Sequence, residues 1–446
     1  MKPLFISAFL IFFLGSSCTI SQAAQTVKPK QIIIITLDTT RPDYLGCYGN
    51  KEVKTPRIDT LAKDSVLFTN CFSTTEFTLA SHTSIFTSFY MKDHGITTNG
   101  KKLPDFPDFL PKLLKSSGYK TAAFTSDSVL DKNSNISQGF DEFNAAKDRR
   151  RAGETNKFVF NWLDRNKHNK FFLWIHYIDP HMPYDPPAPY NTMYKNASAE
   201  RLSAKSAKNE ELLEYFFGEY LKQSNDPEHY RNLYKGSISY LDAQLGKLFD
   251  RLKDLGIYHN SCIIVLADHG EPLGEHGTFF FHNQLYDEDV RIPLIFKSRK
   301  ENRSGPREQL VSSIDIYPTV LDIAGVGNKK PIRGKSILKM INNSRSPEIH
   351  DALYYQLDFE LFMGIKTREY TYIRQCYEFD KGRRDNGFRL SIKGFIDDAE
   401  GHQELYDNGL DRGQLHDISG SRHDIAAEFD SKAKSFIKDR YNTPAQ

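Results

Sequence analysis

The sequence has few cysteines and no block of like charges. Its 446 residues include five cysteines, and these lie far apart in the chain: Cys18, Cys47, Cys71, Cys262 and Cys376. This spacing lacks the paired pattern of a zinc–cysteine site, and it leaves both free buried thiols and an unassigned disulfide open. The 59 basic and 57 acidic residues give a formal net charge of +2. Because no basic patch stands out, we expect no nucleic-acid partner.

Long apolar runs are also missing beyond the N-terminus. Residues 4–14 form one short apolar run, which is followed by small polar residues. This run is too short to span a bilayer as a helix and is typical of a signal peptide, here residues 1–23. In the alternative interpretation Cys18 becomes a lipidated N-terminus, but Gly15 stands where a lipidation signal prefers leucine. We therefore expect an exported protein, periplasmic or extracellular, with no transmembrane span in the mature chain.

Core-forming residues are abundant. Hydrophobic residues make up 39% of the chain, with 32 Phe and 23 Tyr, which is a globular rather than a disordered composition. Continuous apolar runs predict strands buried on both faces, at residues 31–37, 119–124, 171–178 and 262–267. Amphipathic or capped segments between them predict helices, at residues 57–65, 103–117, 153–165 and 234–255. Together they predict an α/β fold with a mixed, mostly parallel central sheet flanked by helices.

The chain is predicted to divide into two parts after the signal peptide. Residues 24–345 make up the large α/β domain, and a polar stretch around residues 342–347 marks its end. Two short strands and a closing helix follow, at residues 370–373, 403–406 and 424–440. We therefore predict a small C-terminal α+β subdomain over residues 346–446. Residues 197–228 are highly charged and helical in propensity, and we expect an insertion there.

Polar residues stand where three of the predicted strands end. Asp38 follows the first strand, Asp268 and His269 follow another, and His181 lies just past a third. In open α/β sheets, sites form outside the carboxyl ends of the strands. Each residue alone has an ordinary explanation in a turn or loop, but their coincidence after separate buried strands does not. Two carboxylates and an imidazole converging at one edge predict a site for a divalent cation.

Thr78 begins a helical segment, Thr78–Thr87. The simpler interpretation is that its hydroxyl caps the N-terminus of the helix. The functional interpretation uses the same geometry, because a hydroxyl at a helix N-terminus lies in a ready anion site. A metal ion nearby would lower the pKa of the hydroxyl and orient it for attack on sulfur or phosphorus.

These motifs together resemble the sulfatase family of the alkaline phosphatase superfamily. The resemblance extends over roughly residues 31–420 and is strongest in these segments: 34–43, 46–49, 55–59, 68–70, 93–95, 268–277, 285–295 and 404–407. It implies an alkaline-phosphatase-like fold and one divalent metal ion. It also implies the roles of six residues: Asp38, Asp268 and His269 as metal ligands, Thr78 as metal-bound nucleophile, and His181 and His282 as contacts to the substrate anion, one of which protonates the leaving oxygen.

Several positions depart from the family pattern. Thr78 stands where classical sulfatases oxidise Cys or Ser to formylglycine, and oxidising a threonine would give a ketone, so no formylglycine is expected. His82 replaces the motif arginine and Thr39 replaces a second aspartate, while Ser126–Ser128 stand in place of a Lys-x-His segment. With one aspartate fewer and an imidazole ligand, Mn²⁺ or Zn²⁺ is favoured, and Ca²⁺ is the alternative.

The sequence thus predicts an exported, metal-dependent hydrolase that cleaves a sulfate or phosphate ester of a small molecule or glycan. Chemically, a threonine nucleophile favours the phosphoester, as in the threonine-nucleophile branch of phosphonate and phosphate ester hydrolases and phosphotransferases. The alternatives are a true sulfuric ester hydrolase acting on a sulfated glycan, a phosphotransferase, and a non-catalytic binder of anionic glycans.

Overall fold

A computed structural model describes residues 29–196, 218–280, 282, 284–298, 304–327, 330–357, 362–375 and 402–439. Its central sheet has eight strands in the order β4-β3-β5-β1-β6-β7-β2-β8. Their bounds in chain order are β1 Gln31–Leu37, β2 Val66–Phe72, β3 Lys120–Thr125, β4 Glu142–Ala145, β5 Phe171–Tyr177, β6 Cys262–Leu266, β7 Arg291–Lys297 and β8 Gly305–Ser312. Only β7 runs antiparallel to its neighbours. The predicted mixed, mostly parallel sheet is confirmed.

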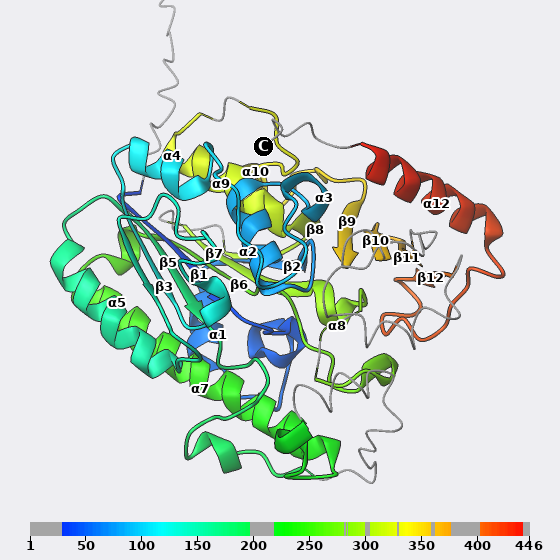
Figure 1. Ribbon diagram of the computed structural model, residues 1–446, viewed down its shortest axis with the longest axis horizontal. Coiled ribbons are helices and arrows are strands. Elements are labelled where there is room, and N and C mark those ends of the chain that lie inside the picture. Colours follow the sequence, from blue (N-terminus) through cyan, green and yellow to red (C-terminus); the bar gives the residue numbers. More distant parts are fainter. Residues whose placement is uncertain are drawn as a thin grey trace, which may run out of the picture.

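Helices cover both faces of this sheet (Figure 1). Among the described residues, the helices that accompany this sheet are α1 Pro56–Lys63, α2 Thr78–Thr87, α3 Met91–His94, α4 Leu110–Ser116, α5 Ala152–Asn166, α7 Pro227–Asp254, α8 Asp287–Val290, α9 Ile316–Ala324 and α10 Leu338–Asn342. Side chains of β1 alternate between the two faces, so Ile33 and Ile35 pack with α1, α5 and α7, whereas Ile32 and Ile34 pack with α2, α4, α9 and α10. This two-sided burial explains the unbroken apolar sequence of β1.

A second, antiparallel sheet of four strands lies beside the first, in the order β12-β11-β10-β9. Its strands are β9 Leu353–Leu357, β10 Phe362–Lys366, β11 Tyr370–Gln375 and β12 Gln403–Asp407, and helix α12, His423–Lys438, packs on one face. Side chains of the other face, including Leu353 and Tyr355, share a hydrophobic cluster with Phe72 and Leu310 of the central sheet. The small sheet is therefore anchored to the large one through apolar contacts.

The helix predicted over residues 103–117 is wrong in its first half, because α4 begins only at Leu110. Upstream, the backbone N–H of Leu103 donates to the carbonyl of Ser134 (2.8 Å), and that of Phe106 donates to Gln138 Oε1 (2.8 Å). Prolines at 104 and 107 lack N–H donors and disfavour a continuous helix. This segment therefore bonds to a neighbouring loop rather than to itself.

Some predictions concern residues outside the described ranges. The signal peptide and most of the insertion at residues 197–228 lie outside them, and so do Cys18 and Cys376. Cys47, Cys71 and Cys262 are free thiols.

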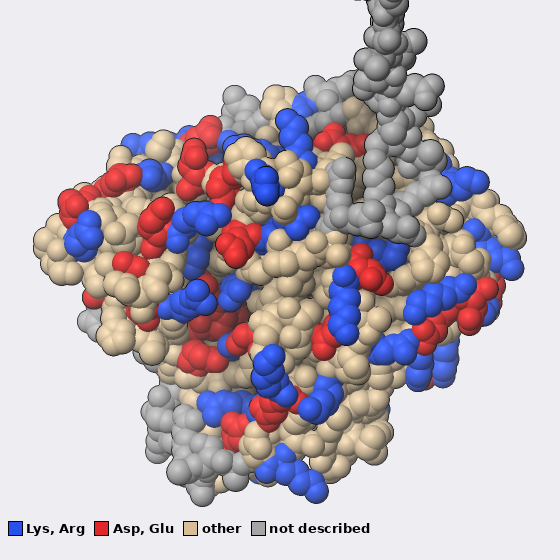
Figure 2. Space-filling model, turned by 180° about the vertical axis from the view of Figure 1, so that it is seen from behind, with Lys and Arg blue, Asp and Glu red and all other residues tan. Residues whose placement is uncertain are grey.

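Within the described ranges, none of the helices combines the length and apolar character that a membrane crossing requires. Figure 2 shows acidic and basic side chains interspersed over the face it presents.

Candidate active site

The carboxyl ends of β1, β5 and β6 meet at one edge of the sheet, because β1 pairs in parallel with both neighbours. Asp38 follows β1 directly, and its backbone N–H donates to the carbonyl of Tyr177 at the end of β5 (2.9 Å). Asp268 and His269 follow β6. All three side chains are fully buried. The register of the strands thus brings together the two carboxylates and the imidazole that the sequence placed at strand ends.

Thr78 reaches the same edge from helix α2. It is the first residue of the helix, and the cap position before it belongs to Phe77, whose side chain makes no capping hydrogen bond. The interpretation of Thr78 as a helix cap is therefore wrong. Its Oγ1 lies 3.3 Å from Nε2 of His269 instead. The hydroxyl thus faces the carboxylate–imidazole cluster.

The protonation of His269 follows from its hydrogen bonds. Nδ1 lies 3.0 Å from the carbonyl of Gly270, which can only accept, so Nδ1 carries the proton of the neutral ring. Burial, together with His282, holds the pKa of His269 well below its usual value, so the ring is neutral. Its Nε2 lone pair then lies 3.7 Å from Asp38 Oδ1 and 3.6 Å from Asp268 Oδ2.

A cation fits this arrangement of lone pairs. Within the described part of the chain, Asp38 Oδ1 and Asp268 Oδ2 are buried without a hydrogen-bond partner. The candidate ligand atoms of Asp38, Asp268 and His269 all lie within 4.8 Å of one another. Burial raises the pKa of both carboxyl groups well above the usual value, and repulsion from Asp38 adds to the effect on Asp268. A bound divalent cation would neutralise these carboxylates and satisfy the orphaned oxygens.

His181 and His282 lie beside each other and next to His269. Their ring centroids lie 5.3 Å apart, and the ring of His282 lies 4.2 Å from that of His269. Nδ1 of His181 donates to the carbonyl of Met182 (2.5 Å), and Nδ1 of His282 lies 3.6 Å from Oε2 of buried Glu271. Burial lowers the pKa of His181 to about 4. All six residues chosen from the sequence thus lie in one cluster.

The replaced family positions also have defined contacts. The N–H of Thr39 donates to Asp268 Oδ1 (3.3 Å) from a left-handed backbone with φ of 50°. Ser126 Oγ donates to the carbonyl of His176 (2.6 Å) and accepts from the N–H of Ile178 (3.0 Å). Ser126 therefore ties β5 to β3 and does not supply the cation of a Lys-x-His segment.

Sequence reasoning missed two buried residues of the site. His176 lies inside β5 and donates to Asp38 Oδ2 through Nε2 (3.1 Å). Glu271 is fully buried and accepts from the hydroxyl of Tyr184 (2.7 Å). The signal for His176 was a single ionisable residue within an otherwise apolar strand. Glu271 stands in one of the family motifs, but its position three residues after Asp268 does not reveal its contacts.

The fold and the strand-end cluster define a hydrolase of the alkaline phosphatase superfamily. Residues 30–326 match the family model described as Sulfatase, and residues 274–432 match the model described as N-sulphoglucosamine sulphohydrolase, C-terminal. The chain belongs to the sulfatase family and is a sulfate or phosphate ester hydrolase.

Individual relatives include both kinds of enzyme. An N-acetylglucosamine-6-O-sulfatase of Bacteroides thetaiotaomicron is 23% identical, over 95% of this chain and 87% of the relative. The solved structure of another protein, in complex with that protein's substrate D-glucosamine-2-N,6-O-disulfate, has a TM-score of 0.74 at 20% identity, covering 94% of this chain and 99% of the other. The phosphonate monoester hydrolase of Agrobacterium radiobacter has a TM-score of 0.73 at 20% identity, covering 92% and 95%. The two solved structures thus share the fold of this chain.

Proposed function

We propose that this protein is an exported, metal-dependent esterase that uses Thr78 as its nucleophile and favours a phosphate ester. The carrying observation is that Thr78 Oγ1 lies 3.3 Å from His269 Nε2, beside the orphaned oxygens of Asp38 and Asp268. Asp38, Asp268 and His269, with Thr78, would hold one divalent cation. When bound, this cation would stabilise negative charge and lower the pKa of the Thr78 hydroxyl.

The donor set favours particular metals. It combines two carboxylates, an imidazole and a hydroxyl, all fully or almost fully buried. A nitrogen donor and a small number of oxygens suit Mn²⁺ or Zn²⁺ better than Ca²⁺, which prefers six to eight oxygen ligands. We propose Mn²⁺ or Zn²⁺ as the activating ion.

The reaction begins when Thr78 Oγ, whose proton has passed to solvent, attacks the phosphorus atom and the bond to the leaving alcohol breaks. His282, whose ring Glu271 flanks at 3.6 Å, donates a proton to the departing oxygen. A phosphothreonine results. Water then attacks phosphorus, the Thr78–phosphorus bond breaks with its electron pair returning to Thr78 Oγ, and inorganic phosphate is released. His181 accepts the proton of that water, because its Nδ1 proton is held by Met182 and its Nε2 lone pair is available in the neutral ring.

The preference for phosphorus follows from the nucleophile. Formylglycine releases sulfate by collapse of a hemiacetal-type intermediate, which a threonine ester does not permit. The sulfated-glycan alternative is supported by the 23% identical sulfatase relative and by the second family model. A paired assay separates these functions.

The test compares an aryl phosphate, an aryl phosphate diester and an aryl sulfate under Mn²⁺, Zn²⁺ and Ca²⁺. We expect metal-dependent turnover of a phosphate ester and little of the sulfate. Thr78→Ala should lose at least about a thousandfold in kcat. Thr83→Ala is the matched control, because Thr83 lies on the same helix and its hydroxyl donates to the Leu79 carbonyl (2.7 Å). Faster turnover of the sulfate, or full activity in Thr78→Ala, would refute the proposal.

Export is the remaining part of the proposed function. It rests on the basic, apolar and small-residue segments of residues 1–23. Expression with and without these residues, followed by cell fractionation and N-terminal sequencing, tests it. We expect the mature chain to begin at Ala24 in the exported fraction. A chain that keeps Met1 in the cytoplasmic fraction would contradict export.

A further inference from the structure

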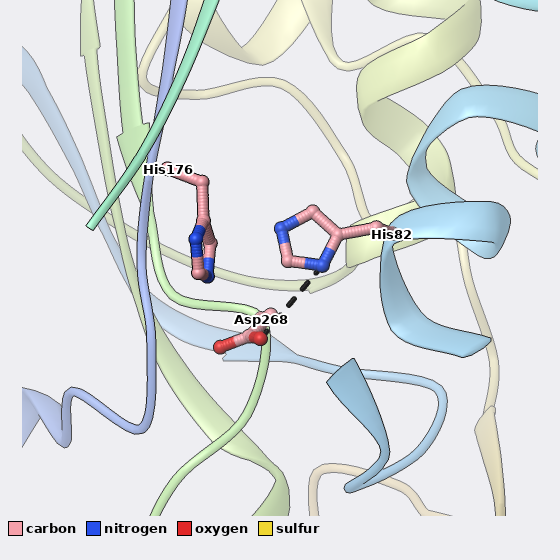
Figure 3. Close-up of side chains that lie close together, drawn as sticks. All are labelled: His82, His176 and Asp268. Atoms are coloured by element: carbon pink, nitrogen blue, oxygen red, sulfur yellow. Dashed lines mark ion pairs between the residues drawn. The ribbon is translucent and has the colours of Figure 1, made fainter. Parts of the chain in front are cut away.

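A second group of metal-ligand types lies beside the proposed metal site. His82 projects from helix α2 and His176 from strand β5, and both approach Asp268 (Figure 3). Their ring centroids lie 5.3 Å apart, and all three side chains are fully buried. Ligand atoms of this trio lie within 4.8 Å of one another, as in the first group. The group therefore invites the interpretation of a second metal site that shares Asp268.

The hydrogen bonds of His82 oppose that interpretation. Trp174 Nε1–H can only donate, and it donates to Thr36 Oγ1 (3.0 Å). The Thr36 hydroxyl proton is then directed to His82 Nε2 (3.0 Å), and His82 Nδ1 donates to the carbonyl of Thr78 (2.7 Å). Both ring nitrogens are thus engaged, and the 3.8 Å from Nδ1 to Asp268 Oδ2 is too long for a hydrogen bond.

The contact of His176 has a different consequence. Its Nε2 donates to Asp38 Oδ2 (3.1 Å) and so leaves Oδ1 as the oxygen directed to His269. His176 pairs in register with Thr36, and Trp174 precedes it by two residues on the same strand. The two imidazoles are therefore joined through the ends of β1 and β5. One ring contacts a proposed metal ligand and the other contacts the nucleophile residue.

We propose that His176 and His82 are positioning residues that fix Asp38 and Thr78 relative to each other. His176 makes Asp38 a ligand through one oxygen, Oδ1. His82 holds the backbone of Thr78 against β1, in place of the arginine that the family motif carries there. This inference rests on the proposed function, since it assigns supports to that metal site and that nucleophile.

Metal binding tests the role of His176 independently of activity. His176→Phe removes the donor, whereas His176→Gln keeps an N–H at a similar reach. Calorimetric titration of the metal-free full chain with Mn²⁺ and Zn²⁺ gives the Kd and the stoichiometry. Loss of a hydrogen bond to a metal ligand typically weakens binding by about 10- to 100-fold, so we expect this loss in the Phe variant and substantial recovery in the Gln variant.

The role of His82 predicts a different signature. His82→Leu removes the bond to the Thr78 carbonyl, and His82→Asn keeps a donor where Nδ1 stood. We expect kcat to fall by at least about tenfold in the Leu variant, with KM and the metal Kd changed by less than about threefold, and to recover in the Asn variant. A general loss of folding would weaken metal binding as well as lower kcat, so circular dichroism and the metal titration separate the cases.

His350→Gln is the matched control for both tests. His350 is also buried and lies 2.8 Å from a carboxylate oxygen of Asp315, but it belongs to no part of the proposed site. We expect its Kd and kcat to match the wild type. Asp38→Asn should abolish binding, and if it binds the metal normally, the proposed metal site fails first.

Two results would overturn the positioning roles while leaving the proposed function intact. One is a stoichiometry of two metal ions in the wild type that falls to one in His82→Leu and His176→Phe, because the trio would then be a second metal site. The other is an unchanged Kd in His176→Phe together with an unchanged kcat in His82→Leu.

Discussion

Asp268→Asn should make the metal-free protein more stable although it abolishes metal binding. Asp268 Oδ2 is buried and lacks a hydrogen-bond partner within the described residues, and its ligand oxygen lies within 4.8 Å of that of Asp38. Two unit charges at that separation repel by about 3.5 kcal/mol at an effective dielectric constant of about 20. An amide removes one of these charges at almost the same volume.

The expected gain is about 1–3 kcal/mol, because an unpaired buried polar oxygen costs about that much and the amide keeps one acceptor. Unfolding entropy of about 2.1 cal/mol/K per residue over 446 residues converts each kcal/mol into about 1 °C. The metal-free variant should therefore melt about 1–3 °C above the metal-free wild type. Metal at 100 times its Kd should raise the free energy of unfolding of the wild type by about 2.7 kcal/mol and leave that of the variant unchanged.

The pH dependence has a definite sign. Burial raises the folded-state pKa of Asp268 above its unfolded value, so the native state binds the proton more tightly than the unfolded chain. The penalty of ionised Asp268 is present above the folded pKa and fades as the pH falls toward the unfolded value of about 3.9. The advantage of Asp268→Asn should thus be larger at pH 8 than at pH 5.

Differential scanning calorimetry of chelator-treated protein measures both effects. Thr83→Ser, a mild change within helix α2, serves as the control. A metal-free Asp268→Asn variant that melts below the metal-free wild type would refute the electrostatic account of this site. A metal-induced rise equal to that of the wild type would show that Asp268 is not a ligand.

Three further predictions concern the nucleophile Thr78, the proposed proton donor His282 and the carboxyl group of Asp242, which lies outside the site. Thr78→Ser keeps a hydroxyl, so its kcat should exceed that of Thr78→Ala by at least about a hundredfold; equal rates in the ester assay would argue against a hydroxyl nucleophile. His282→Asn should lower kcat more for an alkyl than for an aryl phosphate, because a poor leaving group needs the proton more; an equal loss for both esters would remove His282 as the proton donor. Burial raises the pKa of Asp242 to about 7, so the free energy of unfolding of the wild type should fall by up to about 4 kcal/mol between pH 4 and pH 8, and Asp242→Asn should not show this fall. Urea unfolding at both pH values checks this, and an equal fall in both proteins would contradict it.

The sequence predicted four of the strands that are buried on both faces: β1, β3, β5 and β6. The runs that became β1, β5 and β6 are continuous and apolar because helices cover both sides of the sheet there. It missed β2, β7 and β8, whose pairing depends on partners far away in the chain: Phe68 pairs with Leu294 and with Arg307. β2 and β8 carry polar residues among apolar ones, and β7 contains Pro293, so the local pattern does not separate these strands from loops.

The site was predicted from strand ends and from family motifs, and the supporting contacts were not. Asp38, Asp268 and His269 follow recognisable strands, so parallel pairing alone brings them together. The bonds of His82 and His176 link residues 46 and 138 positions apart. Which nitrogen of each ring bears a proton depends on those distant partners, and no local pattern contains that information.

Peptide mass spectrometry after acid quenching tests the central claim most directly. The full-length enzyme, loaded with Mn²⁺ or Zn²⁺, is mixed with a rapidly cleaved aryl phosphate, quenched during turnover and digested. We predict a phosphoryl group on Thr78, in the peptide that contains helix α2, and no such group in Thr78→Ala. Turnover with no label on Thr78, or with the label on another residue, would contradict the assignment of Thr78 as the nucleophile.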